Sequence, residues 1–272
     1  MELFNEEKED LLRTIEEKNR RIEDLQRNGK GGFGDETRGE FEKLAIKEYV
    51  FLSRLAETAE SYNDMVEFIT RVVRVKGDSI TKEERNLLTT AFKQSLQKAR
   101  NAHLKISDIE KKADYKDFSS LITKFKKKFE RDILTESNRH LDFVKTHVIE
   151  KMRDKEQQVF FYKMLADHYR YISEVTSGKD FEDSKKSSQQ YYVKAKDIAD
   201  KSLQITHPTL LGVYINYTVF LADIMKDERT ACDILKPIVE KGKRSLNFAD
   251  ENYEDSKKIL DLMEENLVLW NE

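Results

Sequence analysis

Apolar residues recur every three or four positions along most of this chain, with short polar breaks between segments. This spacing is typical of amphipathic helices, because one face of a helix turns inward about every 3.6 residues, whereas a half-buried strand alternates with a period of two. We therefore expect nine helices after residue 36, with sequential neighbours antiparallel because the breaks are short. The expected helices begin near Thr37, Tyr62, Thr81, Tyr115, Asp154, Phe181, Pro208, Glu228 and Asp250, and the last ends at Trp270.

Local signals mark several of these helix ends. Gly77 is a natural C-terminal cap for the second helix, and Gly178 is expected to close the fifth. Thr81 with Glu84 three residues later forms a capping box at the start of the third helix. Pro208 suits the first turn of the seventh. The third helix is expected to bury a stripe formed by Leu88, Phe92, Leu96, Ala99, His103, Ile106 and Ile109.

The first 36 residues differ from the rest. Apolar residues at heptad-like spacing between Asn5 and Arg27 predict one short extra helix, which is marginal as a coiled coil alone. Four glycines within residues 28–35 predict a flexible linker. Lys30 follows a glycine there, but no Ser or Thr follows it, so a phosphate loop is not indicated. The sequence thus predicts an N-terminal extension over 1–36 and a helical domain over 37–272.

Composition narrows the functional classes. With 49 basic and 52 acidic residues, the net charge of −3 gives no global field that favours nucleic acid. Only 2 Pro and 9 Gly among 272 residues, with 37% charged residues, suit long solvated helices. The single cysteine, the acidic N-terminus and the lack of a long apolar run point to a cytoplasmic chain, with the nucleus as a further location.

Candidate chemistry lies in two pairs of cations. Lys93 and Arg100 are seven residues apart and share one face of a predicted helix, as do Lys163 and Arg170 on another. If these lines faced each other across a groove, the cations and the hydroxyl of Tyr171 would suit a phosphoryl group, which carries nearly two negative charges and three acceptor oxygens. The spacing predicts a local anion site without proving that the two helices meet.

A plainer interpretation stays open at this point. The same cations can be solvated surface residues in ion pairs along the helix with Asp167 or Glu174. Asn216 and Asn266 lie on otherwise apolar helix faces, where they can bind the main chain of an extended peptide. They can equally be asparagines satisfied by neighbouring helices.

Catalytic interpretations find little support. The five histidines form no metal-ligand motif, and Cys232 has no evident histidine partner, so it is expected to be a packed small hydrophobe. The basic run from Lys124 to Lys128 is better explained by a solvated helix face than by nucleic-acid or membrane contact. We expect no enzyme, no cofactor and no metal site.

Four ordered motifs then supply a family resemblance, which extends over about Glu48 to Trp270. The motifs are Glu84-Arg85-Asn86-Leu87-Leu88 with Ala91-Phe92-Lys93, Tyr162-Lys163-Met164 with Tyr169-Arg170-Tyr171, Thr206-His207-Pro208 with Leu211-Gly212, and Asn266-Leu267 with Leu269-Trp270. In this order and spacing they resemble the 14-3-3 family. The resemblance implies an all-α fold of nine antiparallel helices in a cup-shaped monomer, here with an extra N-terminal helix, and two cups in a dimer.

The resemblance also implies a function and a site. It implies an adaptor that binds phosphoserine or phosphothreonine segments of client proteins in an amphipathic groove and regulates the clients in signalling. The implied phosphate-binding residues are Lys93, Arg100, Arg170 and Tyr171. The implied peptide groove adds Lys163, Asn216, Ile215, Val219, Asp223, Leu262, Asn266 and Trp270. The implied dimer interface contains Leu55, Ala59, Asp64, Phe125, Lys128 and Asp132, with Asp64 pairing across it with Lys128.

Departures from the family pattern temper these implications. Ser61 stands where the family has an arginine that pairs between subunits, and Lys258 replaces a groove leucine. We hypothesise that the extension over residues 1–36 supplements the dimer interface. The partner subunit is a second copy or a paralogue, and neither nucleic acid nor a membrane is an expected partner. The alternative function is a helical scaffold that binds proteins independently of phosphate.

Overall fold

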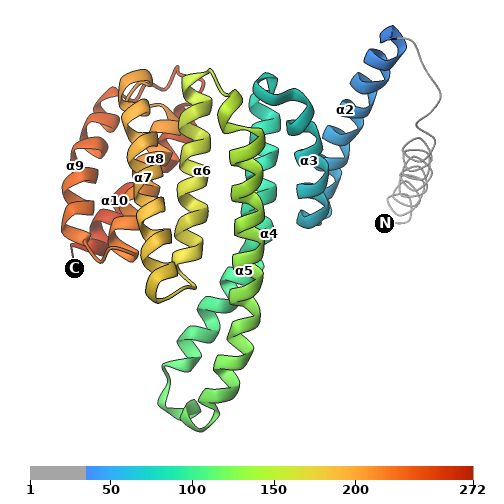
Figure 1. Cartoon of the computed structure of the whole chain (residues 1–272). Helices are drawn as coiled ribbons and strands as arrows, with labels where there is room; N and C mark the ends of the chain where they lie inside the picture. The colour runs from blue at the N-terminus through green and yellow to red at the C-terminus, as the bar shows by residue number, and fades with distance from the viewer. Residues whose placement is uncertain (1–34, 272) are drawn as a thin grey trace, which may run out of the picture. The chain divides into compact units, whose positions relative to one another are not determined.

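The computed structural model describes residues 35–271, with side chains from Ile46 onward (Figure 1). The predicted N-terminal helix over residues 5–27 and the linker up to residue 34 lie outside the described residues. The chain divides into two compact units, residues 1–48 and 49–272, and the candidate site lies wholly in the second. The sequence-based boundary at residue 36 stays a prediction.

Nine α-helices and no strand occur within residues 35–271, which confirms the all-α prediction. The helices are α2 (Asp35–Thr58), α3 (Tyr62–Lys76), α4 (Lys82–Glu110), α5 (Ser119–His147), α6 (Lys155–Ser173), α7 (Gly178–Ser202), α8 (Pro208–Asp223), α9 (Glu228–Ser245) and α10 (Tyr253–Trp270). Three short 3-10 turns, η1 (Gly77–Ser79), η2 (Ala113–Phe118) and η3 (Ile149–Lys151), join some of them. None of the described helices has the length and apolar character that crossing a membrane requires.

Most helix ends follow the local signals. The Thr81 side chain accepts a hydrogen bond from the Glu84 backbone N–H, and the Glu84 carboxylate accepts one from the Thr81 N–H, so the capping box forms as predicted. Gly77, with φ of 57°, ends α3 in a backbone conformation that glycine adopts without strain. Pro208 is the first residue of α8.

Two predictions about helix boundaries and burial were wrong. Gly178 does not close the fifth helix, because α6 already ends at Ser173; its φ of 59° instead turns the chain into the start of α7. Ile109 is 38% exposed rather than buried. The last turns of α4 and the first of α5 project as a hairpin beyond the neighbouring helices, so this end of the apolar stripe is less covered than the rest of α4 (Figure 1).

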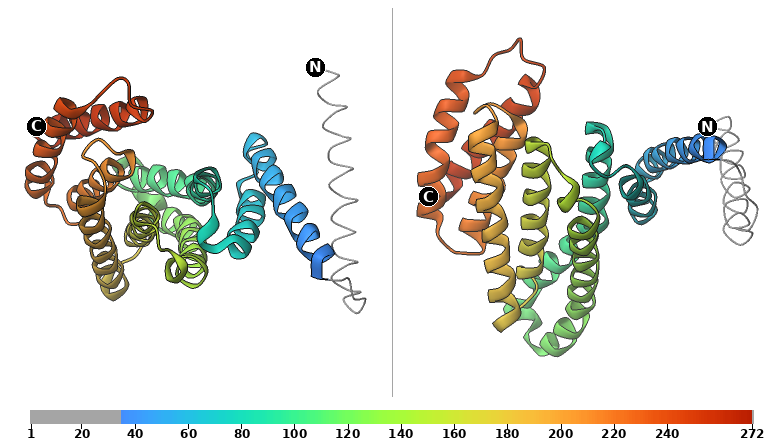
Figure 2. Two further views of the ribbon diagram at one scale, coloured as in Figure 1. Left: turned by 90° about the horizontal axis from the view of Figure 1, so that it is seen from above. Right: turned by 45° about the horizontal axis from the view of Figure 1, so that its top comes forward.

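The helices from α3 to α10 pack in chain order, each against the next, and α8 also contacts α6 and α10 (Figure 2). One buried core cluster joins residues of α6, α7, α8, α9 and α10, and Leu211 and Leu235 within it are fully buried. Helices α4, α6, α8 and α10 all contribute to one pocket. Alternate helices of the second unit therefore line one shared cavity.

Candidate functional site

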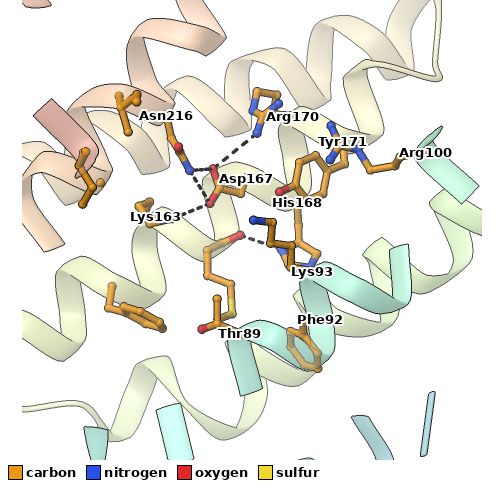
Figure 3. Close-up of a pocket in the computed structure, with 15 residues that line it drawn as sticks. Thr89, Phe92, Lys93, Arg100, Lys163, Asp167, His168, Arg170, Tyr171 and Asn216 are labelled. Atoms are coloured by element: carbon orange, nitrogen blue, oxygen red, sulfur yellow. Dashed lines mark hydrogen bonds and ion pairs between the residues drawn. The ribbon is translucent and has the colours of Figure 1, made fainter. Parts of the chain in front are cut away.

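The pocket between alternate helices has a volume of about 410 Å³ (Figure 3). Four cations line it, namely Lys93 and Arg100 from α4 and Lys163 and Arg170 from α6. Apolar side chains line it too, among them Phe92, Phe160, Met164, Ile215 and Ile259. The two lines of cations predicted from seven-residue spacing thus lie along a shared cavity.

Asp167 is the centre of the hydrogen bonds in the pocket. Its carboxylate lies 2.8 Å from Lys163 Nζ and accepts from Asn216 Nδ2 at 2.9 and 3.1 Å, and it also accepts from the Tyr192 hydroxyl. Burial alone would raise the pKa of Asp167, but the charges of Lys163 and Arg170 outweigh it and hold the pKa below its ordinary value. Asp167 therefore stays ionised and fixes the side chains around it.

The orientation of Asn216 follows from this arrangement. A carboxylate only accepts hydrogen bonds, so the amide NH₂ of Asn216 must face Asp167, as the dashed lines in Figure 3 show. Its carbonyl oxygen has no hydrogen-bond donor within the described part of the chain. Asn216 thus lines the pocket with an acceptor free for a backbone N–H of a ligand.

Glu174 joins the two arginines of the site. The Arg100 fork donates through Nε at 3.0 Å and through a terminal nitrogen at 2.8 Å, and Arg170 donates to the same carboxylate at 2.9 Å. Both guanidinium groups also lie over the Tyr171 ring, at 3.8 and 4.9 Å from its centroid. Ion pairs along the helix therefore do form, but the arginine side chains are only 16% and 11% exposed and are not solvated surface groups.

The pocket carries an excess of positive charge. Its four cations pair with two carboxylates, Asp167 and Glu174, so these six residues carry two more positive than negative charges, with Asp223 near enough to Arg170 to interact with it. Lys93 is exposed, and among residues 46–271 no carboxylate pairs with it. Burial opposes the charge of Arg170, yet its phenolic and anionic neighbours, Tyr192, Tyr171 and Glu174 among them, raise its pKa well above the ordinary value. The site suits a doubly charged anion.

Tyr171 supplies a neutral donor beside these charges. Burial raises the pKa of its hydroxyl, so the proton is retained at physiological pH. The hydroxyl makes no hydrogen bond to another described side chain or backbone group. It is therefore available to an anion held by the arginines.

Two histidines beside the pocket were not predicted to interact. His168 lines the pocket, its Nδ1 lies 2.8 Å from the Met164 carbonyl oxygen, and its Nε2 lies 3.1 Å from His140 Nδ1. Phe92 stacks on the His140 ring at 3.8 Å. Burial lowers the pKa of His168 to about 4 and that of His140 well below its ordinary value. The two rings come from different helices, 28 residues apart, so no local motif could have revealed the pair.

The structure gathers only some of the predicted groove residues in this pocket. Lys93, Arg100, Lys163, Arg170, Tyr171, Ile215 and Asn216 all line it. Val219 and Asp223 on α8 and Leu262, Asn266 and Trp270 on α10 are not among its lining residues, and Trp270 packs against the core. Their part in binding stays a prediction. Sequence reasoning gave Asp167 and Glu174 only as partners in surface ion pairs, although each follows a lysine or arginine of the site by four residues.

The predicted dimer residues lie on accessible surfaces. Ala59, Asp64, Lys128 and Asp132 are exposed, and Leu55 is partly buried. Phe125 is 57% exposed, which is unusual for a large aromatic side chain. Asp64 accepts a hydrogen bond from the Ser61 hydroxyl at 2.6 Å. These residues are free to meet a partner, and their role stays a prediction.

Comparison with known proteins gives a consistent result. The family model described as 14-3-3 protein matches residues 52–271. The chain is 34% identical over 233 residues to the 14-3-3-like protein B of Hordeum vulgare. The aligned region covers 84% of this chain and 89% of the relative. The 14-3-3-like protein GF14-E of Oryza sativa subsp. japonica matches equally. The 14-3-3-like protein GF14 chi of Arabidopsis thaliana is 34% identical over 231 residues, covering 83% of this chain and 86% of the relative.

Proposed function

This chain belongs to the 14-3-3 family, and we propose that it is an adaptor that binds phosphoserine or phosphothreonine segments of client proteins. The observation that carries the proposal is the pair of uncompensated positive charges in a pocket that also holds an unpaired lysine, Lys93. A phosphoryl group carries between one and a half and two negative charges at neutral pH, which complements this excess.

In the proposed complex, three kinds of hydrogen-bond donor bind the phosphate. Arg100 and Arg170 offer the guanidinium N–H donors that Glu174 and Tyr192 do not occupy, and Lys93 contributes a mobile point charge. Tyr171 adds a neutral hydroxyl. Because Glu174 already holds both arginines in place, little side-chain freedom remains to be lost when the anion binds.

The rest of the groove suits an extended peptide. The free carbonyl oxygen of Asn216 can accept from a peptide N–H, and Ile215 with Ile259 offers apolar contact beside it. We place Val219, Asp223, Leu262, Asn266 and Trp270 along the continuation of this groove. The proposed role is recognition of a client in the cytoplasm or nucleus rather than catalysis.

We further propose that two copies associate through α2, α3 and α5. The exposed Phe125 and the charges of Asp64, Lys128 and Asp132 support this interface. Two grooves in one dimer would let a client with two phosphorylated sites bind with an effective second-site concentration of about millimolar.

The decisive experiment compares a fluorescent phosphoserine peptide with its unphosphorylated twin by anisotropy. We expect binding of the phosphopeptide alone. Lys93→Glu removes a charge-assisted contact worth about 1.5–3 kcal/mol and adds repulsion, so binding should fall by at least about a hundredfold. Lys93 is exposed and unpaired, so helicity measured by circular dichroism should not change.

Lys98→Glu is the matched control, because Lys98 is also exposed on α4 but does not line the pocket. It should retain the wild-type affinity. Equal binding of both peptides would instead favour the phosphate-independent scaffold. An equal loss in both variants would show that the long-range field, and not a contact of Lys93, governs binding.

A further inference from the structure

One wall of the groove is the helix α10, whose faces can be assigned from burial. Ser256, Leu260 and Met263 are buried against the neighbouring helices and define its inner face. Ile259 lies beside this face and lines the pocket. At about 100° per residue, Ile259 marks the edge of α10 at which the groove begins.

Continuing around α10 in the same direction leads to Asn266, Leu262 and then Lys258. Lys258 is about 40° beyond Leu262 and one turn before it, so the two side chains are neighbours on the groove side of the helix. Leu262 is 49% exposed, and Lys258 is exposed as well. The groove wall therefore ends in an apolar surface bordered by a cation.

Lys258 differs from the other charged residues near it. Lys257 pairs with Asp261 at 2.7 Å, and Glu264 pairs with Lys243 of α9. Lys257 and Glu264 lie about 100° and 120° around α10 from Lys258. Within residues 46–271, Lys258 has no carboxylate partner. Lys258 thus keeps an ammonium group that no carboxylate holds in an ion pair, although Glu254 and Glu265 lie on the same side of the helix.

We infer that Lys258 makes the groove prefer client segments that carry an acidic residue on the α10 side of the phosphorylated residue. This inference rests on the proposed phosphopeptide function and adds a residue that determines specificity within it. The phosphate supplies most of the affinity, and the second carboxylate selects among phosphorylated segments. Such selection needs no further pocket, because an exposed ion pair tolerates some variation in geometry.

The expected preference is modest and sensitive to salt. An exposed ion pair strengthens binding by about two- to fivefold. Screening at high ionic strength should remove most of that gain, because the Debye length falls to about 3 Å at 1 M salt. The affinity of the phosphate contact itself should persist better, because the arginines are largely buried.

The test is a set of phosphoserine peptides in which glutamate or its neutral isostere glutamine occupies each flanking position in turn. Dissociation constants are measured by anisotropy for the wild type, Lys258→Met and Lys257→Met. Both variants lose one positive charge from α10, at positions about 100° apart around the helix. The comparison of glutamate with glutamine in each protein forms a double-mutant cycle.

We expect glutamate to tighten binding about two- to fivefold over glutamine at one or two positions, in the wild type and in Lys257→Met but not in Lys258→Met. The inference is overturned if no position shows a preference, if the preference survives in Lys258→Met, or if both variants lose it equally. In those cases the glutamine phosphopeptides still bind, and the proposed function stands. Failure of every phosphopeptide to bind would remove the proposed function and this inference together.

Discussion

Substituting Glu174 tests most directly whether this carboxylate keeps the arginine side chains of the pocket in place before a ligand binds. Its carboxylate, 20% exposed, accepts from both Arg100 and Arg170. Glu174→Gln keeps the shape and one acceptor oxygen but removes the charge. The substitution therefore isolates the electrostatic part of the contact.

The expected loss of stability follows from these distances. Two unit charges about 4 Å apart interact by roughly 4 kcal/mol at an effective dielectric constant of about 20. Part of that is offset because a neutral glutamine is easier to bury, and Arg170 keeps Asp167 at 4.0 Å. We expect a net loss of about 2 kcal/mol, which corresponds to a fall in Tm of about 4–8 °C for a domain of this size.

The same variant should respond more strongly to ligand. Removing the carboxylate raises the uncompensated charge of the pocket from two to three, and a bound phosphate dianion relieves that repulsion. We expect the phosphopeptide to bind about three- to tenfold tighter than to the wild type and to raise Tm by a larger amount at the same peptide concentration. Scanning calorimetry with and without phosphopeptide measures both effects.

Glu182→Gln on α7 is the control, because Glu182 pairs with Lys185 while 62% exposed. Glu182→Gln should lower the free energy of unfolding by less than about 0.5 kcal/mol and leave the phosphopeptide affinity unchanged. An unchanged Tm in Glu174→Gln would refute the claim that the arginines depend on this carboxylate. Binding weakened by more than about tenfold would show that Glu174 aligns the arginine forks more than it balances their charge.

Two further predictions concern acid stability and the dimer. Burial lowers the pKa of His168 to about 4 and lowers that of His140 as well, so below about pH 6.5 the unfolded chain binds more protons than the folded one. The free energy of unfolding should therefore decrease as the pH falls from 7 toward 4.5. For His168 alone, the full decrease is roughly 3 kcal/mol. Urea unfolding across this pH range measures how steeply the free energy of unfolding depends on pH. His168→Phe should make that dependence weaker, and an unchanged dependence in the variant would contradict a histidine origin. The stabilising contribution of the ionised Asp167 is lost only below about pH 4, outside the range tested. For the dimer, Lys128→Glu should weaken association severalfold and Asp64→Lys should do the same, whereas the double variant should restore it if the two residues pair across the interface. Sedimentation of the three variants decides this, and losses that simply add would exclude the pair.

Many features of this chain were predictable because their causes are local. Thr81 and Glu84 cap a helix within a single turn, and Gly77 ends one within a single residue. The seven-residue spacing of Lys163 and Arg170 already places both on one helix face. Gly178 shows the limit of such signals, because a glycine with positive φ can close one helix or open the next. Only the packing of α6 against α7 decides between them.

Identifying the binding site required both the sequence and the tertiary structure. The cations and asparagines could be selected from the sequence, and the ordered motifs indicated the family. Tertiary structure alone showed that Arg100 and Glu174, 74 residues apart, form one ion pair, and that Asp167 orients Asn216 across 49 residues. It also brought His140 to His168 and left the α4–α5 hairpin uncovered. Helix formation depends on neighbours within one or two turns, whereas the balance of charge in a pocket depends on which helix faces meet, and only the packed chain determines that.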